Sequence, residues 1–206
     1  MDKDENSKQR ILNAATHLFA HKGFAATGIR EICRKARVNI CMISYYWGGK
    51  KELYQGIIQD LIEKQTAYAG TFTDLSLNTA KLSKQEQINL LMLTLDKVVD
   101  FLYSKISSDL IILLLKEQQK SDWKVNSPVF YYLKKLIADI FEKDTDCKEI
   151  IFKTVFILSQ INSPRVLSAF TLGQLKQKKF TEEDILIIKE NVKFYVKLLL
   201  KEAGIV

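Results

Sequence analysis

The chain has 206 residues, of which 47% are hydrophobic and 27% charged, so it is long and apolar enough to build a substantial core. It contains only two prolines and eight glycines, and this scarcity of chain-breaking residues favours long helices over many short strands. The longest uninterrupted apolar run, Leu110–Leu115, is far shorter than the roughly 20 residues of a membrane span, and the first ten residues contain no apolar signal core. We therefore expect a soluble, cytoplasmic, all-α protein without a membrane partner.

The net charge of +7 is concentrated near the N-terminus. Residues 8–54 contain nine lysines and arginines but only two acids, so this segment carries the whole net charge. Such a local excess is typical either of a solvated basic surface or of a surface that binds a polyanion. The three cysteines are widely spaced and odd in number, which indicates free thiols and a reducing compartment rather than a disulfide framework.

In chain order, the first 69 residues predict four helices. Ser7 can cap a helix that runs to about His21, and Gly23 ends it. Thr27 can cap a short second helix, which the turn at residues 36–39 joins to a third helix ending near Trp47. A fourth helix is expected over residues 50–69.

The remaining chain predicts six more helices after a polar loop at residues 70–83. Ser83 and Glu86 have the spacing of a capping box, as do Asp146 and Glu149, and Ser127-Pro128 is a favourable helix start. The expected helices cover residues 84–103, 108–120, 127–142, 146–161, 163–175 and 181–202.

Three short helices in a basic segment of about 50 residues have the size of a helix-turn-helix module. In the third helix, Val38, Ile43 and Trp47 fall on one side and predict the face that packs on the rest of the module. The opposite face is then left bare, as the major groove of DNA requires of a reading helix.

These residues resemble the DNA-binding domain of the TetR family of bacterial regulators. The resemblance is carried by RILNAATHLFAHKGFAATGIREI at residues 10–32, VNICMISYYW at 38–47 and KKEL at 50–53. It implies an N-terminal helix-turn-helix domain at residues 1–54, connected by the helix at 50–69 to a larger ligand-binding and dimerisation domain at 70–206. It also implies a transcriptional regulator rather than an enzyme, with double-stranded DNA as a partner and no cofactor.

The resemblance further implies two groups of DNA-contacting residues. Phosphate contacts are expected from Thr27, Tyr45, Tyr46 and Lys50. Positions that face base edges are Arg30, Ile40, Cys41, Met42 and Ser44.

Two departures from the family pattern concern this surface. Arg37 occupies the turn position that glycine usually holds, where a positive φ would cost a non-glycine residue about 1 kcal/mol. The recognition helix begins with the apolar residues at 40–42, which can pack on thymine methyl groups but cannot form bidentate hydrogen bonds. We therefore expect a site rich in A·T pairs, with Arg30 making most of the direct base contacts.

The last helix is apolar on more than one side, so it is either a central core helix or a helix shared between the core and a partner. The resemblance favours the second interpretation, with a homodimer formed by the last two long helices at about 147–161 and 182–202. The segment 110–170 faintly resembles the CecR-like type of regulatory domain. A small-molecule effector of unspecified identity is expected in this half of the chain.

Several large side chains in the same half can line an effector pocket or simply fill the core. These candidates are Met92, Tyr103, Trp123, Phe130 and Tyr131.

Other classes of function have weaker support. His17 and His21 have a spacing that can bind zinc, but no third ligand is evident in the sequence, so we expect no metal site. Cys41 is either a redox switch or a small groove-facing side chain, and we favour the latter. A basic protein that binds membrane surfaces is a third class. The choice between repressor and activator stays open, with repression the family's common mode.

Overall fold

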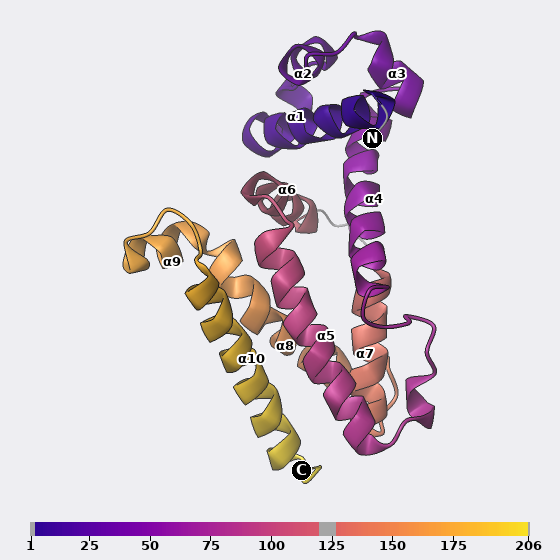
Figure 1. Ribbon diagram of the computed structural model, residues 1–206, viewed down its shortest axis with the longest axis vertical. Coiled ribbons are helices and arrows are strands. Elements are labelled where there is room, and N and C mark those ends of the chain that lie inside the picture. The colour runs from indigo at the N-terminus through magenta and orange to yellow at the C-terminus, as the bar shows by residue number, and fades with distance from the viewer. Residues whose placement is uncertain (1–2, 120–126, 206) are drawn as a thin grey trace. The chain divides into compact units, whose positions relative to one another are not determined.

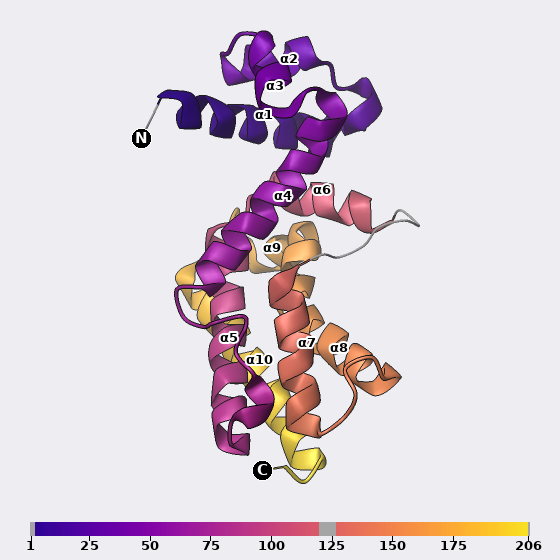
Figure 2. The ribbon, with the colours of Figure 1, turned by 90° about the vertical axis from the view of Figure 1, so that its right-hand side faces the viewer.

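The computed structural model describes residues 3–119 and 127–205, and every regular element among them is a helix (Figures 1 and 2). The all-α prediction is confirmed. The elements are α1 (Lys3–Ala26), α2 (Ile29–Ala36), α3 (Cys41–Trp47), α4 (Lys50–Ala69), the 3₁₀ helix η1 (Thr79–Lys81), α5 (Lys84–Ser104), α6 (Ser108–Gln118), α7 (Pro128–Phe141), α8 (Lys148–Val166), α9 (Ser168–Leu175) and α10 (Glu182–Glu202). No helix in the described part of the chain has the length and apolar character needed to cross a membrane.

Most helix ends follow the sequence signals. Gly23 interrupts α1 with a φ of 82°, and Ser83 and Glu86 form the expected capping box at the start of α5. Ser127 caps α7 and Pro128 occupies its first turn. The broken helical geometry at Gly23 turns the chain toward α2.

Three expectations about the starts of α1, of α8 and of the helix at 163–175 were wrong. Ser7 lies inside α1, which begins at Lys3. Asp146 does not cap α8, whose N-cap is Cys147; its carboxylate instead accepts a hydrogen bond from the Lys134 ammonium at 2.8 Å. Pro164 does not open a new helix, because α8 continues through it to Val166. Pro164 removes one N–H donor from the last turn of α8, and the helix ends two residues later.

The described residues form two compact units. The first contains the chain up to Lys64 together with the segment that begins at Ser107, so α6 packs with α1 rather than with its neighbours in sequence. The second contains Gln65–Ile106 and the chain from Ser127 onward. The functional domain boundary near residue 70 stays a prediction.

The core of the first unit is built by the amphipathic faces of α1–α4 and α6. Phe19 and Ile32 are buried from α1 and α2, Ile43 and Leu53 from α3 and α4, and Leu113 from α6. Two polar contacts also fix α6: the Lys116 ammonium donates to the carbonyl of Ala20, and the Tyr54 hydroxyl donates to the carboxylate of Glu117. Burial and the bond to Glu117 raise the pKa of Tyr54, so it remains a donor.

In the second unit α5, α7, α8 and α10 pack in a ring around one apolar core. A partly buried ion-pair network joins α5 to α10, with the Lys189 ammonium 2.9 Å from Asp96 Oδ2 and 2.7 Å from Asp100 Oδ1. Burial disfavours the charge of Lys189, but the two carboxylates outweigh it and raise its pKa. The network fixes α10 against the bundle and leaves its opposite face uncovered.

Candidate DNA-binding surface

The turn between α2 and α3 is built around Arg37, which stands at the position where glycine is usual. Arg37 adopts a left-handed conformation with φ 55° and ψ 50°. Its N–H donates to the carbonyl of Arg34 at 3.3 Å, and the N–H of Val38 donates to the carbonyl of Cys33 at 3.1 Å. These two bonds form a Schellman motif, which ends α2 and offsets the cost of about 1 kcal/mol of a non-glycine residue in this region.

The start of α3 depends on a residue whose role the sequence analysis missed. The side-chain oxygen of Asn39 accepts a hydrogen bond from the N–H of Cys41 at 3.0 Å, and its carbonyl accepts from the N–H of Met42 at 3.1 Å. Asparagine is among the best residues for capping a helix start, so its position after Val38 was a usable signal. Together with the Schellman motif, this bond sets the orientation of α3 relative to α2.

The inner face of α3 packs as predicted. Ile43 is fully buried, and Val38 and Trp47 are partly buried against the same core. Trp47 lies directly over Gly56 of α4: a Cβ atom at that glycine would be 2.4 Å from the indole Nε1 and 2.7 Å from Cδ1. The indole therefore needs glycine at position 56, a contact that no local sequence pattern indicated.

The outer face of α3 is exposed and carries most of the predicted base-facing residues. Ile40 is 47% exposed and Tyr45 73%, although both are large apolar or aromatic residues. Cys41 and Ser44 are also exposed, as is Arg30 on α2. Met42 and Tyr46 are partly buried at the edges of the core, where the sequence placed them.

Thr27 was wrongly predicted as a helix cap. The N-cap of α2 is Gly28, and the Thr27 side chain is buried, with its hydroxyl donating to the carbonyl of Gly23 at 2.8 Å. This bond stabilises the bend after α1. Since a buried hydroxyl with a filled hydrogen bond does not reach a phosphate, we leave Thr27 out of the contact surface.

Lys50 stands at the start of α4 and is partly buried. Its ammonium donates to the carbonyl of Ala25 at 3.3 Å and lies 4.5 Å from the centroid of the Phe24 ring. These contacts hold the ammonium against the end of α1. The N–H groups of the first turn of α4, where Lys50 begins the helix, also favour an anion.

The surface of α2 remains strongly basic. Glu31 is its only acid, and it is paired with Lys22, whose hydrogen bond lowers the pKa of the Glu31 carboxyl. The remaining exposed charges at the end of α2 are positive, from Arg34, Lys35 and Arg37. A basic helix next to an exposed, uncharged one is an arrangement that binds phosphates on one side and reads bases with the other.

Known proteins with the same N-terminal pattern are bacterial regulators. Residues 11–57 match the sequence profile described as "Bacterial regulatory proteins, tetR family". This N-terminal segment therefore has the sequence of a TetR-family DNA-binding domain. The chain is 26% identical over 215 residues to the helix-turn-helix-type transcriptional dual regulator CecR of Shigella flexneri, an alignment that covers 97% of this chain and 93% of that protein.

One further relative matches part of the chain, and a solved structure shares the chain's fold. The helix-turn-helix-type regulator YttP of Bacillus subtilis is 36% identical over 83 residues, which cover 40% of this chain and only 39% of that protein. The crystal structure of the regulator FadR from Bacillus subtilis, in complex with stearoyl-CoA, has the same fold with a TM-score of 0.57 at 15% identity, covering 90% of this chain and 95% of FadR. The TetR-family match confirms a DNA-binding regulator rather than an enzyme.

The residues predicted to line an effector pocket differ in their surroundings. Tyr103 is a core residue: its hydroxyl donates to the carbonyl of Ile161 at 3.0 Å, and burial raises its pKa to about 12. Met92 packs partly buried on the same core. The rings of Phe130 and Tyr131 have centroids 5.9 Å apart, and Tyr131 is 50% exposed. Trp123 lies outside the described residues.

The structure does contain a hollow of about 450 Å³ in the second unit, but at another place. It lies between η1, the first turns of α5 and the end of α7, and its lining includes Lys84, Gln87, Asp139 and Glu142. None of the described pocket candidates lines it, so the effector site stays a prediction.

The contact between Trp47 and Gly56 gives a direct test of how α3 is held. A glycine-to-alanine change inside a helix normally stabilises a protein by up to about 1 kcal/mol. Gly56→Ala should instead lower the free energy of unfolding by about 1–3 kcal/mol, because the new methyl group overlaps the indole. Urea unfolding followed by circular dichroism measures this difference.

Gly173→Ala is the matched control, since its Cβ would have no neighbour within 4 Å and the residue lies inside α9. This variant should be as stable as the wild type or more so. A Gly56→Ala protein that gains as much stability as Gly173→Ala would show that Trp47 does not pack on α4.

Proposed function

We propose that this chain is a ligand-responsive repressor of the TetR family that acts in the cytoplasm as a homodimer on a pseudo-palindromic operator. The observation that carries the proposal is the exposed outer face of α3, held between two capped turns by the buried Ile43. A rigid helix with a bare face, next to the basic end of α2, is suited to the major groove.

Within this face, the roles divide by chemistry. Arg30 offers a guanidinium for bidentate contact with guanine, whereas Ile40, Cys41 and Met42 offer only apolar or weakly polar contact, which suits thymine methyl groups. Ser44 can bond to either kind of base edge. We assign phosphate contacts to Tyr45, Tyr46 and Lys50, and place the operator among sequences rich in A·T pairs.

A homodimer is proposed through the outer faces of α8 and α10. On α8, Phe152 and Phe156 are 57% and 52% exposed, and their stacked rings have centroids 5.9 Å apart. On α10, Phe194 is 67% exposed and Leu198 46%. The opposite faces of both helices are buried in the core, and the two helices pack on each other. Exposed apolar side chains at this density are typical of a surface that another subunit covers.

Regulation would follow from the dimer. Two copies of α3 can occupy successive major grooves only when they are about 34–36 Å apart. An effector that binds the second unit and favours a different spacing lowers the population that fits the operator. FadR, which shares the fold, was crystallised with stearoyl-CoA, and this supports a small-molecule effector here without fixing its identity.

The proposed DNA-facing side can be tested with duplex DNA of random sequence. Each phosphate contact contributes about one unit to the slope of log affinity against log salt concentration. Lys50→Ala should reduce that slope by about one per subunit, measured by fluorescence anisotropy at several salt concentrations. Lys64→Ala is the control, since this lysine lies about four turns further along α4 and pairs with Asp60. Equal slopes for the two variants would place the DNA on another surface.

The proposed dimer predicts a change of oligomeric state. Phe194→Glu and Phe156→Glu put a charge at the centre of the apolar face, which should raise the dimer dissociation constant by more than about 30-fold. Sedimentation velocity over a range of concentrations measures this change, and circular dichroism verifies folding. Leu77→Glu, at a 37% exposed leucine in the loop between α4 and α5, is the control and should remain dimeric. A wild-type chain that sediments as a monomer at all concentrations would refute the dimer.

A further inference from the structure

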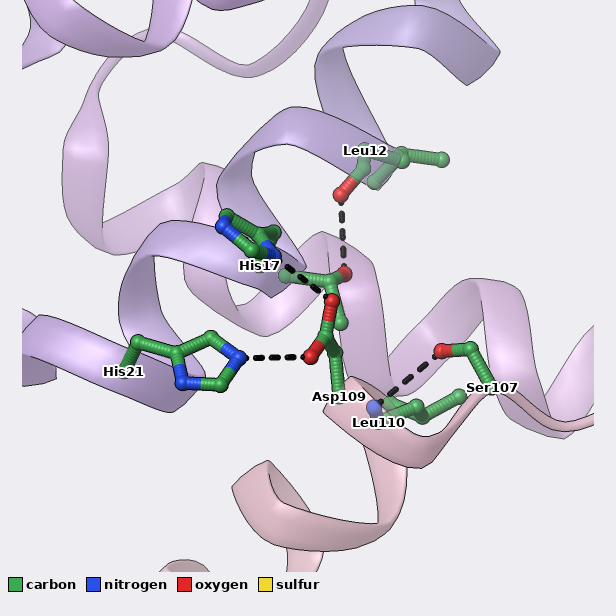
Figure 3. A network of polar contacts seen from close by, with 7 residues as sticks. Leu12, His17, His21, Ser107, Asp109 and Leu110 are labelled. Atoms are coloured by element: carbon green, nitrogen blue, oxygen red, sulfur yellow. Dashed lines mark hydrogen bonds and ion pairs between the residues drawn. The ribbon is translucent and has the colours of Figure 1, made fainter. Parts of the chain in front are cut away.

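Two histidines of α1 and one aspartate of α6 meet at a single point of the first unit (Figure 3). The Nδ1 atom of His17 is 2.8 Å from Oδ2 of Asp109, and the Nε2 atom of His21 is 2.7 Å from Oδ1 of the same carboxylate. These ligand-type atoms all lie within 4.8 Å of one another. His17 and His21 are the only histidines in the chain.

The arrangement is set by the packing of the two helices. His17 and His21 are four residues apart, so they lie one turn from each other on the same side of α1. Asp109 lies in the first turn of α6, whose start is fixed by the Ser107 hydroxyl accepting from the N–H of Leu110 at 3.2 Å. Further along α6, Leu113 is part of the core. Burial of Leu113 fixes α6, and this holds the Asp109 carboxylate next to the histidines.

Two imidazole nitrogens and a carboxylate oxygen form a donor set that suits divalent transition-metal ions, zinc above all. Zinc bonds nitrogen and oxygen at about 2.0–2.2 Å, so two donors on a tetrahedral ion lie roughly 3.3 Å apart. The present hydrogen-bonded separations would have to open by about half an ångström for such an ion. The side chains have room to do so, since 41% of His17, 50% of His21 and 30% of Asp109 is exposed.

We propose that His17, His21 and Asp109 form a binding site for a divalent transition-metal ion such as zinc, with a fourth coordination position open to water. On binding, each imidazole gives a nitrogen lone pair to the ion, and its proton resides on the other ring nitrogen. The carboxylate exchanges its two hydrogen bonds from the rings for a bond to the metal.

An ion at this site would fasten α6 to α1. In the chain, α6 follows α5 directly and precedes α7, both of which belong to the second unit, whereas α1 opens the DNA-binding module. The site therefore cross-links a segment inserted from the C-terminal half of the sequence to the first helix of that module. This metal site does not depend on the proposed dimer or operator.

In the alternative explanation, the three side chains form a hydrogen-bonded clasp, meaning that they bond only to one another and do not bind a metal. In that case Asp109 simply accepts one N–H from each ring and favours the start of α6 through the helix dipole. The two explanations differ in what happens when a metal is added, because a clasp without metal affinity gives no saturable binding.

The test uses the full-length protein with any histidine tag removed and with Cys41 and Cys147 changed to serine, so that their thiols do not bind the metal. Zn²⁺ is titrated in competition with a chromophoric chelator, Co²⁺ absorption reports the ligand type, and NMR follows the two imidazoles. We expect one ion per chain, joint saturable shifts of both imidazole spectra and no thiolate charge-transfer band. Zn²⁺ should also raise the melting temperature.

Variants distinguish the site from background binding. Asp109→Asn and, independently, His21→Gln should weaken Zn²⁺ binding at least about tenfold and abolish the thermal shift. Asp60→Asn is the matched control, since its side chain is 29% exposed in the same unit, and it should bind like the parent protein. Binding that survives both site variants, or imidazole signals that do not respond to metal, would overturn the proposal.

Discussion

The DNA-binding surface depends on the burial of one face of α3, a helix of only seven residues. So short a helix is not stable alone, and its position comes from Ile43 in the core and from Trp47 against Gly56. Two capped turns, at Arg37 and Asn39, then fix its direction. With its inner face buried, the outer face must be exposed, and this explains why large side chains such as Tyr45 point to solvent in a protein with an otherwise ordinary core.

Packing also positions α6, which comes from a distant part of the sequence and completes the core of the DNA-binding unit. Leu113 adds apolar contact, while Lys116 and Glu117 bond to α1 and α4. Because these polar contacts are partly buried, separating α6 from the unit would leave groups without partners, which costs more than the bonds themselves contribute. The helix is therefore part of the unit, and a carboxylate at its first turn reaches the two histidines.

The sequence predicted those features that depend on interactions between residues close together in the chain. The break at Gly23, the capping box at Ser83 and the bare face of α3 each follow from residues close together in the chain. Predictions failed where another hydrogen-bond partner competed with the expected one. Asp146 bonds to Lys134, 12 residues away, instead of capping α8, and Thr27 donates to the nearby carbonyl of Gly23 instead of capping α2. Asp109 is 88 residues from His21, so no sequence spacing marked it as a third ligand. Gly56 gave no signal either, since only packing against Trp47 requires it.

In the proposed function, α3 reads DNA in two copies, one from each subunit. The most direct measurement is to incubate the purified full-length protein with fragments of its own genome at about physiological salt and to sequence those that remain bound. We expect a small set of fragments that share a two-fold symmetric sequence, with half-sites separated by one helical turn or a multiple of it. Uniform recovery of fragments, lost on addition of salt, would contradict this expectation, because binding would then rest on phosphate contacts alone.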